Sequence, residues 1–258
     1  PFIAIEKTHR FNENAFILSV INANSDLKYI DILDVQQNDS IIFSNSDLQS
    51  FDSYLDVDLP EYDEFFHSVQ GYESGQDFDN DGLVLNESTD YAFTEIVGNM
   101  HLGYLSRFSR FRTFINYKKD LYQYNFKKYG AKPNEVIIPS EGSLSITDST
   151  LTNFNYETSL NFVRETSIWS TMREFGSADY SSTTWIVYAP NSNDITVYNI
   201  PEEITQQYPN LDIDLLKHES TELFLQSDSY DAFLKRRLKE TKISSEYIEE
   251  TMQFGKRR

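Results

Sequence analysis

The sequence contains no cysteine, only nine glycines and seven prolines, and no apolar run long enough to cross a bilayer. Without cysteine, a disulfide framework, a thiol nucleophile and cysteine-ligated metal centres are excluded. A membrane-spanning helix needs about 20 consecutive apolar residues, so we expect none here. Glycine and proline are also too scarce for a collagen-like or low-complexity chain.

The N-terminal residues lack the basic-then-apolar pattern of a secretory signal peptide. We therefore expect a cytoplasmic location in a bacterial or infected host cell, or a place in a virion. The 258 residues are 39% hydrophobic and 15% aromatic, and a chain of this size buries roughly 70–75% of its unfolded surface. We expect a single domain over 1–258, with a subdivision near residue 130 as the alternative.

Positive charge is missing from a long internal stretch. No Lys or Arg occurs between Lys28 and Arg107, where seventeen carboxylates carry most of the net charge of −19. Residues 104–129 reverse the sign, with seven basic residues against Asp120 alone. A chain this acidic repels nucleic acid and membranes on average and favours basic partners, so we expect neither nucleic acid nor a membrane as a partner. The acids either meet such a partner or pair with the chain's own basic segment.

Apolar side chains in residues 104–129 recur at steps of three and four residues, which predicts a long helix with an aromatic stripe. The stripe consists of Tyr104, Phe108, Phe111, Ile115, Tyr122, Phe126 and Tyr129. Further helices are expected at 60–70, 90–100, 201–208, 227–240 and 245–253. Strands are expected at 15–21, 29–35, 40–44 and 135–138, within 140–152, and as a hairpin over 183–188 and 194–198. The predicted fold class is α+β, a mixed or antiparallel sheet with the long helix at about 104–129 and C-terminal helices.

Acidic and aromatic residues alternate densely around residue 60. Acids with aromatic anchors are typical of protein interfaces, so we predict a partner-binding surface. Its residues are Asp56, Asp58, Glu61, Tyr62, Asp63, Glu64, Phe65 and Phe66. The stretch 55–66, in which Leu59-Pro60 leads into aromatic residues, is similar over about twelve residues to the helix-entry signature of Smi1/Knr4-type immunity proteins. The resemblance implies a toxin-neutralising binder, although the later aromatic and basic segment departs from that family's pattern.

The charge pattern predicts a non-enzymatic acidic protein that docks a basic protein partner, as an inhibitor or immunity-type protein of bacterial or phage origin would. Two alternatives stay open. The chain could be a structural subunit of a phage virion or another assembly, in which acidic and basic segments of neighbouring copies meet. It could also be a calcium-binding protein or an enzyme of unknown reaction.

A candidate metal site lies at residues 77–87. Asp77, Asp79 and Asp81 precede Gly82 in the spacing D-x-D-x-D-G, which resembles the start of an EF-hand calcium loop. The twelfth position, where that loop carries a bidentate glutamate, is Ser88, and Glu87 comes one residue early. The predicted ligands are Asp77, Asp79, Asp81 and Glu87, with Ca²⁺ as the one cofactor considered.

Catalytic motifs are sparse. No two of the four histidines stand at metal-ligand spacing, and neither a nucleophile elbow nor a glycine-rich phosphate loop occurs. The order Arg164, 182–184 (Ser-Thr-Thr), Glu222 resembles that of ADP-ribosyltransferases, but Ser220 stands where that family carries a Glu or Gln. We therefore predict no catalytic residue and expect a protein that is not an enzyme.

Overall fold

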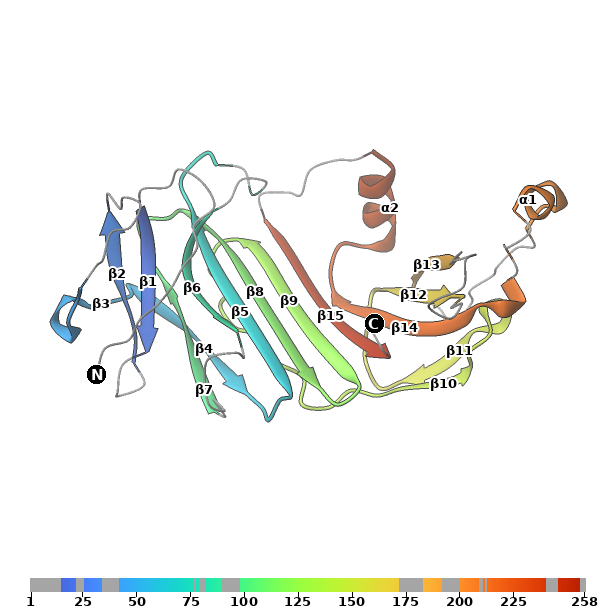
Figure 1. The fold of residues 1–258 in the computed structure, drawn as a ribbon, viewed down its shortest axis with the longest axis horizontal. Coiled ribbons are helices and arrows are strands. Elements are labelled where there is room, and N and C mark those ends of the chain that lie inside the picture. The colour runs from blue at the N-terminus through green and yellow to red at the C-terminus, as the bar shows by residue number, and fades with distance from the viewer. Residues whose placement is uncertain are drawn as a thin grey trace.

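The protein is mostly β-structure. The computed structural model describes residues 15–21, 26–33, 42–76, 78, 82–89, 98–171, 183–191, 200–208, 211, 213–239 and 246–255 (Figure 1). Strands account for 56% and helices for 13%. Within the described ranges, α2 (Tyr230–Lys239) is the only helix of seven or more residues. The expected α+β class with a long helix and C-terminal helices is therefore wrong.

The largest element is an antiparallel sheet of eight strands in the order β13-β12-β14-β15-β9-β8-β5-β6. Its strands are β5 (Glu64–Tyr72), β6 (Leu83–Thr89), β8 (Arg110–Lys119), β9 (Tyr122–Gly130), β12 (Arg164–Ser170), β13 (Thr184–Pro190), β14 (Lys217–Gln226) and β15 (Tyr247–Gly255). Because β15 pairs with β9, the sheet runs without a break across residue 130. A single domain stays a prediction.

A second layer packs on one face of β5, β8 and β9, which we call the inner face. Its strands are β1 (Ala15–Ile21), β2 (Leu27–Leu33), β3 (Gln49–Ser50), β4 (Ser53–Leu59) and β7 (Gly98–Tyr104). Strands β1, β2 and β3 form one small sheet and β4 and β7 another, near the β6 edge of the large sheet (Figure 1). Val57 and Leu102 of this layer share a buried cluster with Val69 and Ile115 of the large sheet.

A two-stranded sheet covers the inner face at the other end of the large sheet. It consists of β10 (Leu144–Asp148) and β11 (Asn155–Thr158). Phe154 and Tyr156 of this small sheet join Trp169, Leu223 and Met252 in a second buried cluster. The large sheet therefore has one core at each end.

Helix α2 lies on the opposite, outer face of the large sheet (Figure 1). Its one buried side chain, Phe233, packs against Tyr188 of β13 with ring centroids 5.2 Å apart. The remaining short elements are η1 (Asn45–Asp47), η2 (Leu151–Asn153), α1 (Glu202–Gln207) and η3 (Ile213–Leu215). Among the described helices, none has the length and apolar character to span a membrane.

The predicted helix at 104–129 is in fact the last residue of β7, a short connection and the hairpin of β8 and β9. Burial in β8 alternates strictly, with Phe111, Ile115 and Tyr117 inward and Arg112 outward. Residues four apart share a side in a strand as well as in a helix, so the steps of four fitted both. Aromatic and β-branched residues favour the strand. The chain reverses at Asp120, which has a positive φ of 50°.

Other expected helices differ from the structure in the same way. The 60–70 segment becomes β5, in which Phe65, His67 and Val69 are buried on one side. The 245–253 segment becomes β15, a central strand whose residues 251–254 are buried on both sides. Such a strand shows no period-two pattern.

Several expected elements are present and others lie outside the described residues. Strands occur at 15–21 and 184–190, and helices occur at 202–207 and 230–239. No strand forms at 135–138. The second half of the expected hairpin, 194–198, and most of the expected helix at 90–100 lie outside the described residues.

Candidate functional site

The predicted partner-binding residues begin on β4, where acids and apolar residues alternate. Leu55 and Val57 are buried in the first core, whereas Asp56 and Asp58 are exposed. Asp56 lies opposite His101 of β7, and its Oδ1 is 2.6 Å from Nδ1 of that histidine. Among the described residues, no hydrogen bond or ion pair involves the side chain of Asp58, whose backbone lies in the β4–β7 ladder. Because successive side chains of a strand point to opposite faces, both carboxylates point into solvent while Leu55 and Val57 point into the core.

The corner between β4 and β5 brings three further acids next to the end of β8. Glu64 forms an ion pair with Lys118. Lys119 Nζ lies 3.6 Å from Oε1 of Glu61 and 3.8 Å from Oδ1 of Asp63. Part of the acidic segment thus pairs with the basic segment of the same chain. The sequence alone left open whether these acids meet a partner or the chain's own basic segment.

The aromatic residues of the predicted surface have three different environments. Phe65 is 5% exposed and belongs to the first core, so it is not available as an interface anchor. Tyr62 is half-buried and packs against Phe65, with ring centroids 5.6 Å apart. Phe66 lies on the outer face beside Phe114, with a centroid distance of 5.7 Å. The five acids are thus the exposed members of the predicted surface.

The leucine-proline step that resembled immunity proteins does not lead into a helix. Pro60 follows β4, and the chain turns into β5 at Glu64. The resemblance therefore loses the structural element on which it depended.

The structure describes only one of the four predicted calcium ligands. Asp77, Asp79 and Asp81 lie outside the described residues, and Glu87 is exposed on β6. Within the described ranges, no group of three or more metal-ligating side chains occurs. Calcium binding stays a prediction.

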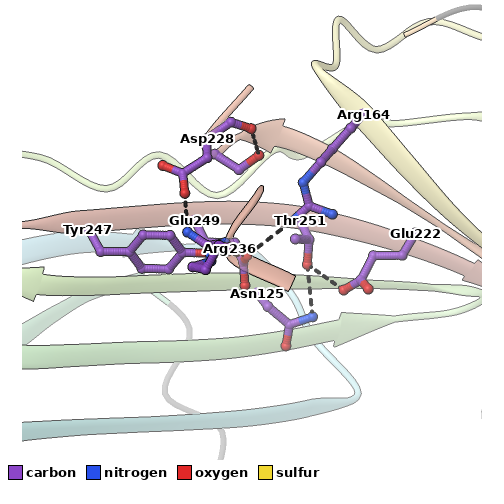
Figure 2. A network of polar contacts seen from close by, with 9 residues as sticks. Asn125, Arg164, Glu222, Asp228, Arg236, Tyr247, Glu249 and Thr251 are labelled. Atoms are coloured by element: carbon purple, nitrogen blue, oxygen red, sulfur yellow. Dashed lines mark hydrogen bonds and ion pairs between the residues drawn. The ribbon is translucent and has the colours of Figure 1, made fainter. Parts of the chain in front are cut away.

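Arg164, at the start of β12, is the centre of a polar network on the outer face (Figure 2). Its side chain is 3% exposed. The guanidinium lies 3.2 Å from the ring centroid of Phe224 and 4.2 Å from that of Phe233 in α2. Its Nη2 is 3.3 Å from Oε2 of Glu249, an oxygen that also accepts a hydrogen bond from Tyr247. Burial lowers the pKa of Arg164, and the charge of Glu249 opposes that shift.

Two groups of contacts extend this network. Asn125 Nδ2 donates to Thr251 Oγ1 at 3.3 Å, and that hydroxyl donates to Glu222 Oε1 at 2.9 Å, which links β9, β15 and β14. On the helix side, Arg236 pairs with Asp228 and lies over the ring of Tyr247 (Figure 2). These contacts fix α2 against the outer face.

Arg164 and Glu222, which stand in the sequence order of ADP-ribosyltransferases, are both part of this network, which the sequence did not predict. Both lie on the outer face of the neighbouring strands β12 and β14, whereas Ser182 lies outside the described residues. Phe233 covers the guanidinium, so the structure lends no support to the resemblance to ADP-ribosyltransferases. Arg164 is the first residue of β12 and is followed directly by Glu165, so the local sequence contains no clear signal of a buried cation.

Burial also shifts the pKa values of three groups on the inner face. It lowers the pKa of His67 and that of His218 to about 4 each. It raises the pKa of Glu165 to about 7. Both histidines are therefore neutral near pH 7, and His218 Nε2 is 2.9 Å from the hydroxyl of Thr221.

Comparison with protein families, curated proteins and solved structures gave no match.

Proposed function

We propose that this chain is a binding protein whose acidic edge docks a basic protein surface, as an inhibitor or immunity-type protein of bacterial or phage origin would. We define the acidic edge as Asp56, Asp58, Glu61, Asp63 and Glu64. The observation that carries the proposal is the exposure of all five carboxylates. Lys118 and Lys119 are their only lysine partners among the described residues, which leaves three carboxylates in excess.

Physical chemistry favours a charged partner for such an edge. Complementary charge speeds encounter and fixes orientation, and it weakens steeply as salt screens it. Exposed ion pairs such as that of Glu64 with Lys118 contribute only about 0–1 kcal/mol, so a partner's arginines and lysines can replace them at little cost.

The test uses Asp56→Asn combined with Asp58→Asn. These side chains point into solvent, so the variant removes charge without removing the lysine contacts of the neighbouring corner. The matched control is Glu202→Gln combined with Glu203→Gln, which removes two exposed charges from α1 instead. A partner captured from the source lysate on the immobilised protein is purified, and its Kd is measured for each variant between about 0.05 and 0.5 M salt.

The expected result is weaker binding and a shallower salt dependence for the β4 variant, with wild-type behaviour for the α1 control. Equal affinities for all three proteins would contradict the proposal. Concentration-dependent assembly of the pure chain, without any other partner, would instead favour the structural-subunit alternative.

A further inference from the structure

One buried carboxyl group in the second core has a single hydrogen-bond partner among the residues that the structure describes. Glu165 on β12 is 1% exposed and faces inward, opposite Leu223 of β14 and Ala189 of β13. Tyr156 of β11 donates a hydrogen bond to its Oε2. Its Oε1 is buried and has no hydrogen-bond partner in the part of the chain that the structure describes.

In the described part of the chain, no positive charge faces Glu165 from the elements packed against it. Leu223, Ala189 and the nearby Phe162 are apolar, and Tyr156 is neutral because burial raises its pKa further. The adjacent Arg164 points to the opposite face, since successive residues of a strand alternate.

Two other titratable groups lie on the inner face of the neighbouring strands. His218 of β14 stacks on Phe154 with a centroid distance of 5.0 Å, and burial lowers its pKa to about 4. Glu250 of β15 lies opposite Phe126, nearer the first core, and burial raises its pKa. Neither neutralises a charge on Glu165.

Glu165 therefore keeps its proton in a range where an exposed glutamate loses it. Burial raises its pKa from the ordinary 4.5 to about 7, and the hydrogen bond from Tyr156 opposes part of that shift. Among the described residues, an ionised carboxylate at this position would have one hydrogen bond and no cation, an arrangement that costs far more than the neutral acid.

The hydrogen-bond donor belongs to the β10–β11 hairpin, residues 144–158, which covers this part of the core. Leu151 and Phe154 of the hairpin are buried in the same cluster. Trp169 Nε1 also donates to the backbone oxygen of Ser149 at 3.0 Å. Lifting this hairpin would remove the ring of Tyr156 from Glu165 and admit water to the carboxyl group.

We propose that Glu165 and Tyr156 form a proton-controlled latch, in which protonated Glu165 keeps the β10–β11 hairpin docked and ionised Glu165 releases it. The docked state binds the proton more tightly than the open state, so opening becomes easier as pH rises. With pKa values of 4.5 in the open state and about 7 in the docked state, the opening constant rises tenfold per pH unit between them. The total increase is about 300-fold, and the constant is level above pH 7.

His218 acts in the opposite direction and has to be separated from the latch. Opening would free its ring from Phe154 and let it bind a proton below about pH 6.5. Acid therefore favours opening through His218 and docking through Glu165, over overlapping pH ranges.

The experiment is amide hydrogen exchange of residues 144–158 in the full chain, from pH 4.5 to 8. Wild type and Glu165→Gln are compared at each pH, so that the intrinsic exchange rate and the effect of His218 cancel in the ratio of opening constants. The expected ratio of wild type to variant rises about 150-fold between pH 4.5 and 8, with most of the rise below pH 7. Amides of β8 serve as the reference for global unfolding and should exchange more slowly.

Two results would overturn the latch. One is a ratio that does not change with pH. The other is exchange of the hairpin at the same rates as β8, because the hairpin would then open only when the whole protein unfolds. If Glu165→Gln does not fold, Tyr156→Phe replaces it. Loss of the Tyr156 hydroxyl removes the hydrogen bond that opposes the raised pKa of Glu165. The rise of the opening constant with pH should therefore continue above pH 7, and a rise that still ends at pH 7 would also refute the latch.

Discussion

Replacing Arg164 with Met tests whether the buried guanidinium fastens α2 to the sheet. Like arginine, methionine is long and unbranched, but it carries no charge and no hydrogen-bond donor. The variant loses two cation–π contacts, worth about 2 kcal/mol or more when desolvated. It also breaks the ion pair with Glu249, and breaking a buried pair costs about 3–5 kcal/mol. Because the Glu249 side chain is 23% exposed and stays partly hydrated, and the buried cation itself is removed, we expect a net loss of about 2–3 kcal/mol.

The assay is urea unfolding followed by circular dichroism, with the free energy of unfolding extrapolated to water. A double-mutant cycle with Phe233→Ala isolates the contact, and we expect a coupling of at least about 1 kcal/mol. Arg164→Lys is the matched control. It keeps the charge but lacks the planar group that stacks between two rings, so it should recover only part of the loss.

Two outcomes would refute this reasoning. Ordinary surface substitutions change the free energy of unfolding by less than about 0.5 kcal/mol. A loss this small for Arg164→Met would mean that the arginine contributes no net stability. Additive effects of Arg164→Met and Phe233→Ala would mean that the ring and the guanidinium do not act together.

Two further predictions concern the first core. A Cβ on Gly103 would lie 2.4 Å from the ring of Phe51, so Gly103→Ala should lower the free energy of unfolding by about 1–3 kcal/mol. Thermal unfolding measures the loss, and an unchanged midpoint would contradict the close packing of β7. Burial lowers the pKa of His67 to about 4, below the unfolded value of about 6.5. The neutral ring therefore contributes stability that is fully present above pH 6.5 and lost as the pH falls to 4. His67→Gln should weaken this dependence in urea titrations at several pH values, and an equally steep loss in the variant would exclude His67 as its source.

Some features followed from local sequence alone. The excess of acidic residues over 29–106 is a property of composition. The exposure of Asp56 and Asp58 on β4 follows from their alternation with apolar residues. Strands β1 and β13 and helices α1 and α2 lie where local patterns and turn residues placed them. Each depends on neighbours a few residues away, so a linear pattern carries the necessary information.

Only the tertiary structure decided the rest. Apolar steps of four at 104–129 suited a helix and a strand alike, and pairing of β8 with β5 and of β9 with β15 decided for strands. The partners of Lys118 and Lys119 lie more than fifty residues away in sequence. Arg164 is covered by Phe233 of α2, which follows it by about seventy residues in sequence, and by Phe224 of β14. Strand pairing and burial depend on which distant segments of the chain meet in the fold. The spacing of residues within one segment contains no information about those distant partners.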